Sequence, residues 1–382
     1  MRILRRGMLT FAVAALVAAC GGGGGSNGTP TFNSVVVFGD SLSDVGTFGL
    51  KFTVQKASDR AAGYPIWPQL VANAVGVNGG AQCNFYTSSG ATFGRNTAVG
   101  CTNYAIGGGR IVNTAAQGGS ASPLTVSTQM LAHTAVGYTP NTLVLIDGGG
   151  NDAADLAGAY LGAAQGAAGV AAYQAFLLQQ LDAATLSGLF AKAGGAENAA
   201  GAYMDKLADT FYASVRNLVL SKGATNVVIL NLPDITLTPR FQAVLYGVSK
   251  ASGAAAAAAV KGGIQAWISA YNAKLKTLAA GDPRVVVVDF YGAFTAQVAN
   301  PSSLGLTDAV NAVCPVVGLD GSGLPSYSFP TCTDTALDTL PGKTAGWWKT
   351  FSFSDGFHPT PRGHELMADS VLTAARGAGW VR

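Results

Sequence analysis

The chain of 382 residues has little charge. Only 11% of its residues are Asp, Glu, Lys or Arg, against roughly 25% in an average soluble protein. The net charge of +3 is spread along the chain, and no stripe of Lys and Arg gathers into the basic footprint of a nucleic-acid-binding protein. We therefore expect no nucleic-acid partner. Because 49% of the residues are hydrophobic, the chain can still bury a sizeable core.

Cysteine is scarce too, and no two cysteines have the C-x-x-C spacing of a zinc or redox site. Setting Cys20 aside leaves four, an even number that allows three disulfide pairings. Pairing sequence neighbours, as Cys83–Cys101 and Cys314–Cys332, closes two polar, turn-rich loops. We predict these two disulfides. Metal binding by the cysteines is the alternative, but no histidine lies near them in the sequence.

The sequence also has no apolar run of transmembrane length at its N-terminus. Three arginines, Arg2, Arg5 and Arg6, precede an apolar stretch from Met8 to Ala19. A bilayer span needs roughly 20 apolar residues, and this stretch is shorter. A basic start followed by a short apolar segment is typical of a secretory signal peptide, which we place at residues 1–19.

The end of this segment, "LVAAC", resembles the lipobox of bacterial lipoproteins, in which the cysteine becomes the lipidated first residue, here Cys20. An ordinary cleavage site with an incidental cysteine is the alternative. The glycine-rich residues 20–32 would then form a flexible tether, followed by one globular domain over 33–382. By the same resemblance, Gly21 after the cysteine indicates a lipid anchor in the outer membrane, with secretion as the alternative.

Four short apolar runs have the pattern of buried strands. Each is followed by Gly, Asn, Asp or Pro, as expected where the strands of a parallel sheet end; the runs are "SVVVFGD", "LVLIDGG", "NVVILNLPD" and "RVVVVDF". Helix-like stretches lie between them, which predicts an α/β fold with helices on both faces of the sheet. The Ala-rich stretch at about 153–202 is longer than a crossover needs. We interpret it as a helical insertion, either a lid near the site or a purely structural helical pair.

A serine after a predicted strand and a distant Asp–His pair are the candidates for catalysis. Ser41 follows the first predicted strand in "GDSL", where it is either a helix N-cap or a nucleophile. A nucleophilic serine needs a base, and "DGFHP" supplies one, with Asp355 three residues before His358. A carboxylate in that position can hold imidazole Nδ1–H and leave Nε2 for the serine. A surface ion pair is the alternative for an isolated D-x-x-H.

Two glycine-rich turns offer donors for an oxyanion. "NYAIGGGR", from Asn103 to Arg110, and "GGGND", from Gly148 to Asp152, both follow apolar segments. Glycines leave backbone N–H groups unobstructed, and Asn151 adds a side-chain amide. Because sites in open α/β sheets form at the carboxyl ends of the strands, we expect these turns to lie near Ser41.

Taken together, these four blocks resemble those of the SGNH/GDSL family of esterases and lipases, in the same order and across nearly the whole mature chain. The resemblance implies a flavodoxin-like three-layer α/β/α sandwich. It implies that Ser41 is the nucleophile, His358 the base and Asp355 the residue that orients it. The oxyanion donors would be the N–H groups of Ser41 and Gly108, with Gly109 as the alternative register, and the amide of Asn151. Neither a metal nor an organic cofactor is needed.

The expected activity is hydrolysis of a carboxylic ester, with an ester or lipid as the small-molecule partner and the membrane as the partner of the anchor. A phospholipase, lysophospholipase or lipid acyltransferase, and a carbohydrate O-acetyl esterase, are alternatives within the family. A surface binding protein without catalysis is the alternative outside it. Trp347 and Trp348 would either line an acyl groove or pack in a core beneath a loop.

Overall fold

A computed structural model describes residues 30–90 and 92–382. The predicted signal peptide, Cys20 and most of the predicted tether lie outside the described residues. Within the described ranges, no helix is both long enough and apolar enough to cross a bilayer.

The four predicted strands form one parallel sheet in the order β1-β4-β5-β6. Runs of Val, Leu and Ile suit a strand that is covered on both faces, and each of the four begins and ends within a few residues of the predicted run. Their bounds are Ser34–Phe38 for β1, Thr142–Ile146 for β4, Asn226–Leu230 for β5 and Val285–Val288 for β6.

A short extended segment continues this sheet beyond β1. The N–H of Val37 donates to the carbonyl of Thr102 at 3.0 Å, and the N–H of Tyr104 donates to the carbonyl of Val37 at 2.8 Å. The segment therefore occupies the place of a second strand outside β1. Counted in chain order, the sheet then runs 2-1-3-4-5, the flavodoxin-like order.

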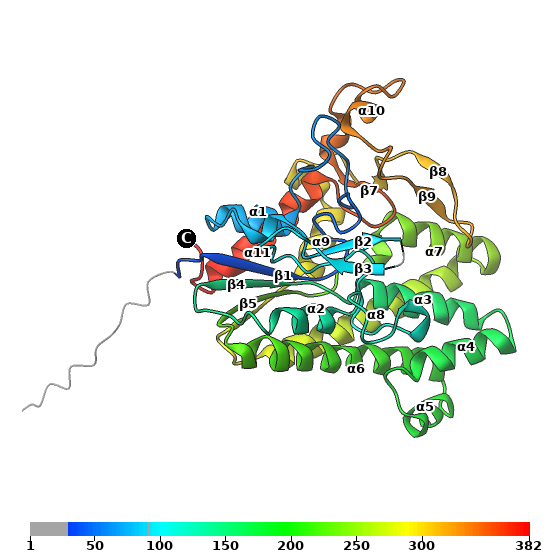
Figure 1. The fold of residues 1–382 in the computed structure, drawn as a ribbon. Helices are drawn as coiled ribbons and strands as arrows, with labels where there is room; N and C mark the ends of the chain where they lie inside the picture. The colour runs from blue at the N-terminus through cyan, green and yellow to red at the C-terminus, as the bar shows by residue number, and fades with distance from the viewer. Residues whose placement is uncertain (1–29, 91) are drawn as a thin grey trace, which may run out of the picture.

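Alternate residues of the strands pack against helices on opposite faces of the sheet. Val35 and Val37 contribute to a core with one set of helices, and Val36 and Phe38 to a core with the other. The first set is α1 (Trp67–Ala74), α9 (Phe290–Ala299) and α11 (Pro361–Gly377). The second set is α2 (Val126–His133), α3 (Gly150–Ala163), α6 (Gly195–Leu218) and α8 (Ala254–Ala279). The predicted three-layer α/β/α sandwich is confirmed (Figure 1).

The remaining elements lie outside these three layers or extend them. The additional helices are α4 (Ala167–Leu177), α5 (Ala183–Phe190), α7 (Pro239–Ser252) and α10 (Asp334–Asp338). The additional strands are β2 (Tyr86–Ser89), β3 (Thr92–Arg95), β7 (Asp308–Ala312), β8 (Val316–Leu319), β9 (Pro325–Tyr327) and β10 (Phe351–Phe353). β2–β3 and β8–β9 are antiparallel pairs, and β7 pairs with β10 in parallel.

The Ala-rich stretch at about 153–202 is helical. It supplies most of α3, all of α4 and α5, and the beginning of α6. Tyr173 of α4 and Leu186 of α5 are buried in the core that α6 shares with the sheet. These helices therefore extend the layer on that side of the sheet, and α3 begins at the carboxyl ends of the strands.

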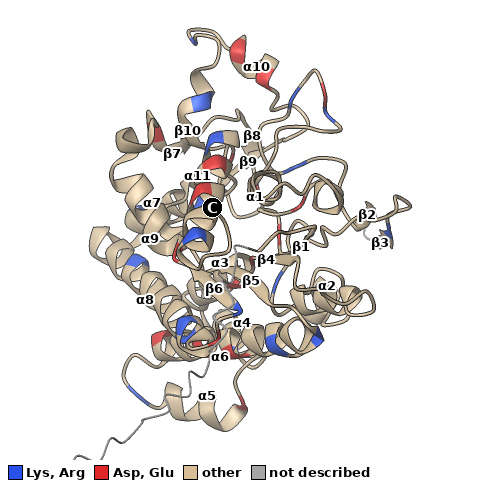
Figure 2. Cartoon of the chain, turned by 90° about the vertical axis from the view of Figure 1, so that its left-hand side faces the viewer, with Lys and Arg blue, Asp and Glu red and all other residues tan. Residues whose placement is uncertain are grey.

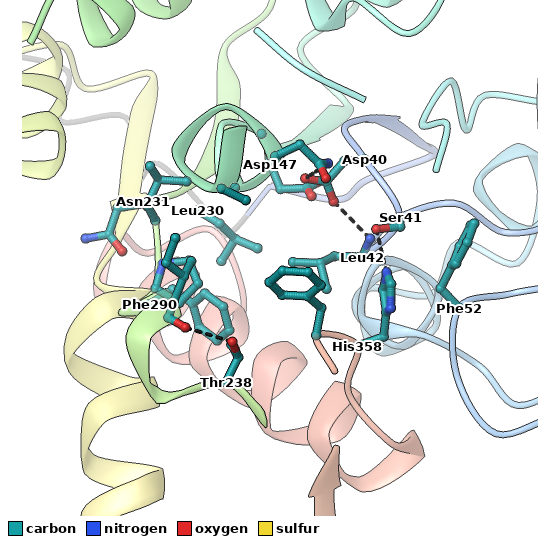
Figure 3. Close-up of a pocket in the computed structure, with 18 residues that line it drawn as sticks. Asp40, Ser41, Leu42, Phe52, Asp147, Leu230, Asn231, Thr238, Phe290 and His358 are labelled. Carbon is teal, nitrogen blue, oxygen red and sulfur yellow. Dashed lines mark hydrogen bonds between the residues drawn. The ribbon is translucent and has the colours of Figure 1, made fainter. Parts of the chain in front are cut away.

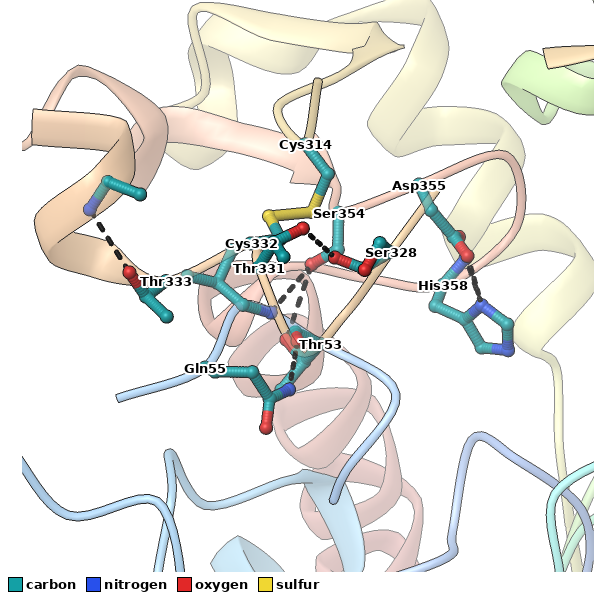
Figure 4. Close-up of a disulfide and its surroundings, with 12 residues drawn as sticks. Thr53, Gln55, Cys314, Ser328, Thr331, Cys332, Thr333, Ser354, Asp355 and His358 are labelled. Carbon is teal, nitrogen blue, oxygen red and sulfur yellow. Dashed lines mark hydrogen bonds and ion pairs between the residues drawn. A yellow bond between two sulfur atoms is a disulfide. The ribbon is translucent and has the colours of Figure 1, made fainter. Parts of the chain in front are cut away.

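Both disulfides join sequence neighbours, as predicted. Cys83 is bonded to Cys101 and Cys314 to Cys332, each across 18 residues. Figure 4 shows the second one close to the loop that carries His358. The N–H of Cys314 donates to the carbonyl of Ser354 at 2.9 Å, and the N–H of Ser354 donates to the carbonyl of His358 at 2.7 Å. This disulfide therefore anchors the backbone on which His358 is held.

We expect the Cys314→Ser/Cys332→Ser double variant to lose about 3 kcal/mol of unfolding free energy, because an open loop of this size gains entropy in the unfolded chain. Denaturant unfolding followed by circular dichroism measures the loss. The Cys83→Ser/Cys101→Ser variant is the matched control, and its loss should be similar because the closed loop is equally long. A loss below ~1 kcal/mol in both would contradict the chain-entropy account.

Candidate active site

Ser41 lies at the edge of the sheet where β1 ends. The turn after Phe38 is pinned at Gly39, whose N–H donates to Gln129 Oε1 at 2.9 Å and whose carbonyl accepts from Gln129 Nε2 at 3.0 Å. A Cβ atom at Gly39 would lie 1.7 Å from Asp147 Oδ1, so only glycine fits there. This close approach turns the chain sharply and leaves Ser41 half-buried at the strand end.

Asp44 ties this turn to the second glycine-rich block. Its Oδ1 accepts the N–H groups of Gly46 at 2.9 Å and Thr47 at 2.8 Å, and its Oδ2 accepts the N–H of Gly107 at 2.8 Å. One buried carboxylate thus holds two loops that are about sixty residues apart in the sequence. Asp44 therefore braces the turn that carries Ser41.

The structure brings Ser41, His358 and Asp355 together. His358 Nε2 lies 2.8 Å from Ser41 Oγ, and His358 Nδ1 lies 2.8 Å from Asp355 Oδ2. Asp355 Oδ1 also accepts the backbone N–H of His358 at 2.7 Å, so the carboxylate holds both the ring and the loop. Figure 3 shows the imidazole next to both the serine and Phe52, and Figure 4 shows the Asp355 carboxylate above its other nitrogen.

The carboxylate and the imidazole change each other's pKa. Burial raises the pKa of Asp355, but the charge and hydrogen bonds of His358 bring it below its ordinary value. Burial lowers the pKa of His358, but the charge and hydrogen bond of Asp355 and the charge of Asp40 raise it above its ordinary value. The arrangement therefore favours the ion pair, in which the imidazole holds an extra proton.

Two aromatic rings hold the imidazole in place. Phe52 stacks on His358 with ring centroids 5.1 Å apart and an angle of 27° between the rings, and Phe329 meets it edge-on at 5.5 Å. A Cβ atom at Gly107 would lie 2.3 Å from the Phe52 ring, so the glycine gives that ring its space. Phe52 is not among the predicted site residues, since nothing local in the sequence marks a residue some three hundred positions away from its partner.

The other two histidines are buried away from Ser41. His133 Nδ1 lies 3.0 Å from the hydroxyl of Tyr104, and His364 accepts a long hydrogen bond from the N–H of Trp67 at its Nδ1. Burial lowers the pKa of both side chains. Of the three histidines, His358 alone contacts Ser41.

The backbone N–H groups of Ser41 and Gly108 have no hydrogen-bond partner among the residues that the structure describes. Gly108 has a φ of +81°, in the left-handed region that favours glycine. In the alternative register, the N–H of Gly109 is already used, because it donates to the carbonyl of Ile106 at 2.9 Å. The geometry therefore favours Gly108 over Gly109 as a donor to a bound ligand.

Asn151 lies in the first turn of α3, and its amide points toward the same edge of the sheet. Its Nδ2 donates to the carbonyl of Gly109 at 2.9 Å and, more weakly, to Asp40 Oδ2 at 3.4 Å. The first bond fixes the side chain against the second block. The second is long, so that hydrogen is the one most easily given to another acceptor.

A pair of buried carboxyl groups lies beneath these donors. Asp40 and Asp147 adjoin at the ends of β1 and β4, as Figure 3 shows. Burial raises the pKa of both. The N–H of Leu42 favours the charged form of Asp40, and the charge of Asp40 further raises the pKa of Asp147, so we assign the proton to Asp147. Sequence reasoning missed Asp147, although an acid directly after a buried strand was a usable signal.

A cavity of 170 Å³ opens from Ser41 along the carboxyl ends of β4, β5 and β6 (Figure 3). Its walls are mostly apolar, and they include Leu42, Leu230, Ile235 and Phe290. We call it the inner cavity. In residues 30–90 and 92–382, no three His, Cys, Asp or Glu side chains gather in a way that would hold a metal ion.

The two tryptophans lie elsewhere. Trp348 is 1% exposed and packs with Val54 and Leu337 beneath a loop. Its indole N–H donates to Asp338 at 2.9 Å, and that of Trp347 donates to the carbonyl of Leu337. Trp348 is thus a core residue beneath the loop and Trp347 is half-buried against the same cluster, and neither lines the inner cavity.

A family model described as GDSL-like Lipase/Acylhydrolase matches residues 35–371, which include all four blocks. The chain belongs to this family. Membership makes the matched domain, residues 35–371, an ester-hydrolysing serine hydrolase. The resemblance seen in the sequence is thereby confirmed, and the interpretation as a non-catalytic binding protein is wrong.

Three individual proteins are similar to the chain. An uncharacterized protein in the trpE-trpG intergenic region of Pseudomonas putida is 25% identical over 389 residues, covering 96% of this chain and 52% of that protein, so the chain spans about half the length of this curated relative. An extracellular lipase of Streptomyces rimosus is 17% identical, with 90% and 99% coverage and a TM-score of 0.37. Phospholipase A1 of Streptomyces albidoflavus NA297 is 15% identical, with 90% and 100% coverage and a TM-score of 0.39.

Proposed function

We propose that the protein hydrolyses carboxylic esters through an acyl-enzyme on Ser41, with His358 as general base and Asp355 as the residue that orients it. The observation that carries the proposal is the continuous chain of contacts from Ser41 Oγ through His358 to Asp355, with 2.8 Å at each step. This is the geometry that lets a base take the serine proton while a carboxylate fixes its tautomer.

The reaction would run in two halves. In the first, Ser41 Oγ bonds to the ester carbonyl carbon while His358 takes its proton and then gives that proton to the departing alcohol. In the second, His358 takes a proton from water, the hydroxide attacks the acyl-serine, and the proton returns to Ser41 as the acid leaves. Each half passes through a tetrahedral oxyanion.

The N–H groups of Ser41 and Gly108 and the amide of Asn151 would bind that oxyanion. The two backbone donors have no competing partner within the described chain. The amide would exchange its 3.4 Å contact to Asp40 for the substrate oxygen while keeping its bond to Gly109. Donors that are already in place cost little reorganisation when charge develops.

The activity is tested on purified protein with p-nitrophenyl esters from acetate to palmitate. A fluorophosphonate probe then reports on the nucleophile, because it labels a serine that a neighbouring base activates. We expect turnover that saturates with substrate, loss of turnover on labelling, and the added mass on the peptide that contains Ser41. Label on another serine, or turnover unaffected by complete labelling, would contradict the assignment.

Asn151→Ala should lower kcat by about 10²- to 10³-fold with little change in KM, because an oxyanion donor acts mainly in the transition state. Steady-state kinetics on p-nitrophenyl butyrate measures both constants. The matched control is Asn198→Ala, an exposed position on α6, which should behave like the wild type. An increase in KM at constant kcat would instead assign Asn151 to substrate binding.

We further propose that the protein is exported and anchored in the bacterial outer membrane by a lipid on Cys20, acting on an ester or lipid substrate. The two disulfides support export, since such bonds persist in oxidising compartments. The test is mass spectrometry of the N-terminal peptide from the membrane fraction. The lipid mass should be present on the wild type, and Cys20→Ser should move the protein to the soluble fraction. An unmodified Cys20 in membrane-bound protein would refute the anchor.

A further inference from the structure

A larger hollow opens beside the inner cavity. It measures 1180 Å³, and it shares Asn151, Ala154 and Phe357 with the inner cavity, so the two adjoin at these residues. Its walls come mainly from α3, α7 and the β8–β9 hairpin, which Figure 1 shows on one side of the molecule, and residues of the 110–117 segment and Phe176 of α4 complete them. We call this hollow the trough. Apart from Asn151, no residue that lines it takes part in the catalytic steps above.

α3 and α7 each line the trough with one face, and glycines on both faces leave space between the two helices. On α3 the lining residues include Ala154, Gly158 and Gly162, spaced as neighbours on one helix face. On α7 they include Gly247. A Cβ atom at Gly158 or Gly247 would meet nothing within 4 Å. The space between the helices is therefore open, and a large group can lie in it.

The trough holds paired charges. Of the described residues that line it, three are charged, namely Arg110, Asp155 and Arg240. Arg110 lies 2.7 Å from Asp155, and Arg240 lies 2.8 Å from Asp320 of the hairpin. Figure 2 shows the same low charge across the chain, with the two signs interspersed. Because each guanidinium is neutralised by a carboxylate, a phosphate or carboxylate ligand would find no unpaired cation among the described residues that line the trough.

The rest of the lining combines uncharged polar groups with aromatic rings. Thr114, Gln117 and Gln165 supply hydroxyl and amide groups, and Gln117 Nε2 donates to Asp155 at 2.9 Å. Tyr246 is 64% exposed at one side, and Phe357 lies at the boundary with the inner cavity. Hydroxyl and amide groups donate and accept hydrogen bonds, and aromatic faces pack against C–H surfaces. The combination suits a sugar, which has both hydroxyl groups and C–H faces.

The inner cavity is unsuited to such a group. It is several times smaller than the trough, and away from Ser41 its lining is mostly apolar, with side chains such as Leu230, Ile235 and Phe290. The two polar side chains there, Asn231 and Thr238, already donate hydrogen bonds to Asp289 and to the Ile235 carbonyl. A hydroxyl group buried there without a partner would lose hydrogen bonds to water. An acyl chain would fit it without that cost. The two halves of an ester would thus lie on opposite sides of Ser41, with the acyl group in the inner cavity and the polar alcohol group in the trough.

We propose that the trough binds the alcohol half of the substrate, and that this alcohol is large, uncharged and rich in hydroxyl groups, as in an acylated oligosaccharide. The inference rests on the proposed hydrolysis at Ser41 and adds the substrate class to it. Phe357 is the boundary: its ring packs on Phe241 with centroids 6.0 Å apart, and the Arg240 guanidinium lies 5.7 Å from its centroid.

The test places a large side chain in the trough, either from α3 or from α7, and compares substrates that have the same acyl group. The variants are Gly158→Trp and Gly247→Trp, and the control is Gly262→Trp, an exposed α8 glycine whose Cβ would also meet nothing within 4 Å. The substrates are p-nitrophenyl butyrate, butyrylated maltotriose and dibutyryl phosphatidylcholine. Both trough variants should lower kcat/KM for the maltotriose ester at least about tenfold, or ~1.4 kcal/mol, and change p-nitrophenyl butyrate less than about twofold. The control should change neither.

Other results would overturn the proposal. A fourth substrate with a long acyl chain, p-nitrophenyl laurate, tests the opposite placement: loss of its hydrolysis in the trough variants, with the maltotriose ester unaffected, would place the acyl chain in the trough. A wild-type preference for phosphatidylcholine that both variants abolish would show that the head group is charged. Saturation-transfer NMR measures the binding of free maltotriose, which does not depend on ester hydrolysis. This measurement therefore tests the trough separately from the reaction at Ser41. The wild type should bind maltotriose and both trough variants should not, even if no ester is turned over. Equal binding by all would refute the site.

Discussion

Ser41→Ala should lower kcat/KM for p-nitrophenyl butyrate on the order of 10⁵- to 10⁶-fold, because loss of the nucleophile removes the covalent pathway and leaves only binding and the oxyanion donors. Nothing in the fold depends on the hydroxyl group: apart from its contact with His358, Ser41 Oγ makes no hydrogen bond within the described residues. The melting temperature should therefore stay near that of the wild type. Stopped assays at high enzyme concentration would measure the residual rate.

The matched control is Ser187→Ala, an exposed serine on α5. It should retain full activity, and its preparation would carry any contaminating esterase at the same level. If Ser41→Ala kept more than about a hundredth of the wild-type rate while the control was normal, Ser41 would not be the nucleophile. The proposed acyl-enzyme would then have to be abandoned.

The central sheet could be predicted from the sequence because its signals are local. Each strand is a short run of β-branched and aliphatic residues that ends at Gly, Asn or Asp, and buried parallel strands need no other information. The small strands could not be found in this way. β8, for instance, has four exposed residues, so its sequence carries no alternation of buried and exposed positions that would identify it.

The residues of the site also fall into two groups, those that the local sequence identifies and those that only the fold brings together. Asp355 and His358 are three residues apart, so their contact is encoded in one loop. Ser41 joins them only through the fold, and its block could be recognised because a nucleophile at a strand end needs a fixed turn. Gln129 and Phe52 could not be recognised. They hold Gly39 and His358 through packing between distant segments, and a buried Gln or Phe has many purely structural explanations.

The trough is the feature that the sequence predicts least. α3, α7 and the β8–β9 hairpin are each predictable at best as separate elements, and their charges are unremarkable in sequence. Only the folded chain places Asp155 against Arg110 and Asp320 against Arg240. The neutrality of this surface, on which the substrate class depends, is therefore a property of tertiary structure.

Asp355→Asn should lower kcat/KM on the order of 10⁴-fold, because an amide can hold the imidazole in the wrong tautomer and no longer stabilises the imidazolium that forms in each half-reaction. The pH profile should shift as well. The base must be neutral to act, so activity rises with pH through the pKa of His358. Asp355 is the main group that raises this pKa. Its loss leaves burial to lower the pKa, and the acid limb of the remaining activity should move to lower pH.

The control for this variant is Asp369→Asn, which removes an exposed carboxylate from α11 and should change neither the rate nor the profile. The direction of the shift separates two accounts of Asp355. If its carboxylate only held the loop, through the N–H groups of Phe357 and His358, an asparagine oxygen would accept the same bonds and the acid limb would stay in place. If the rate falls and the acid limb of the pH profile moves to lower pH, the charge of Asp355 must act on the imidazole itself.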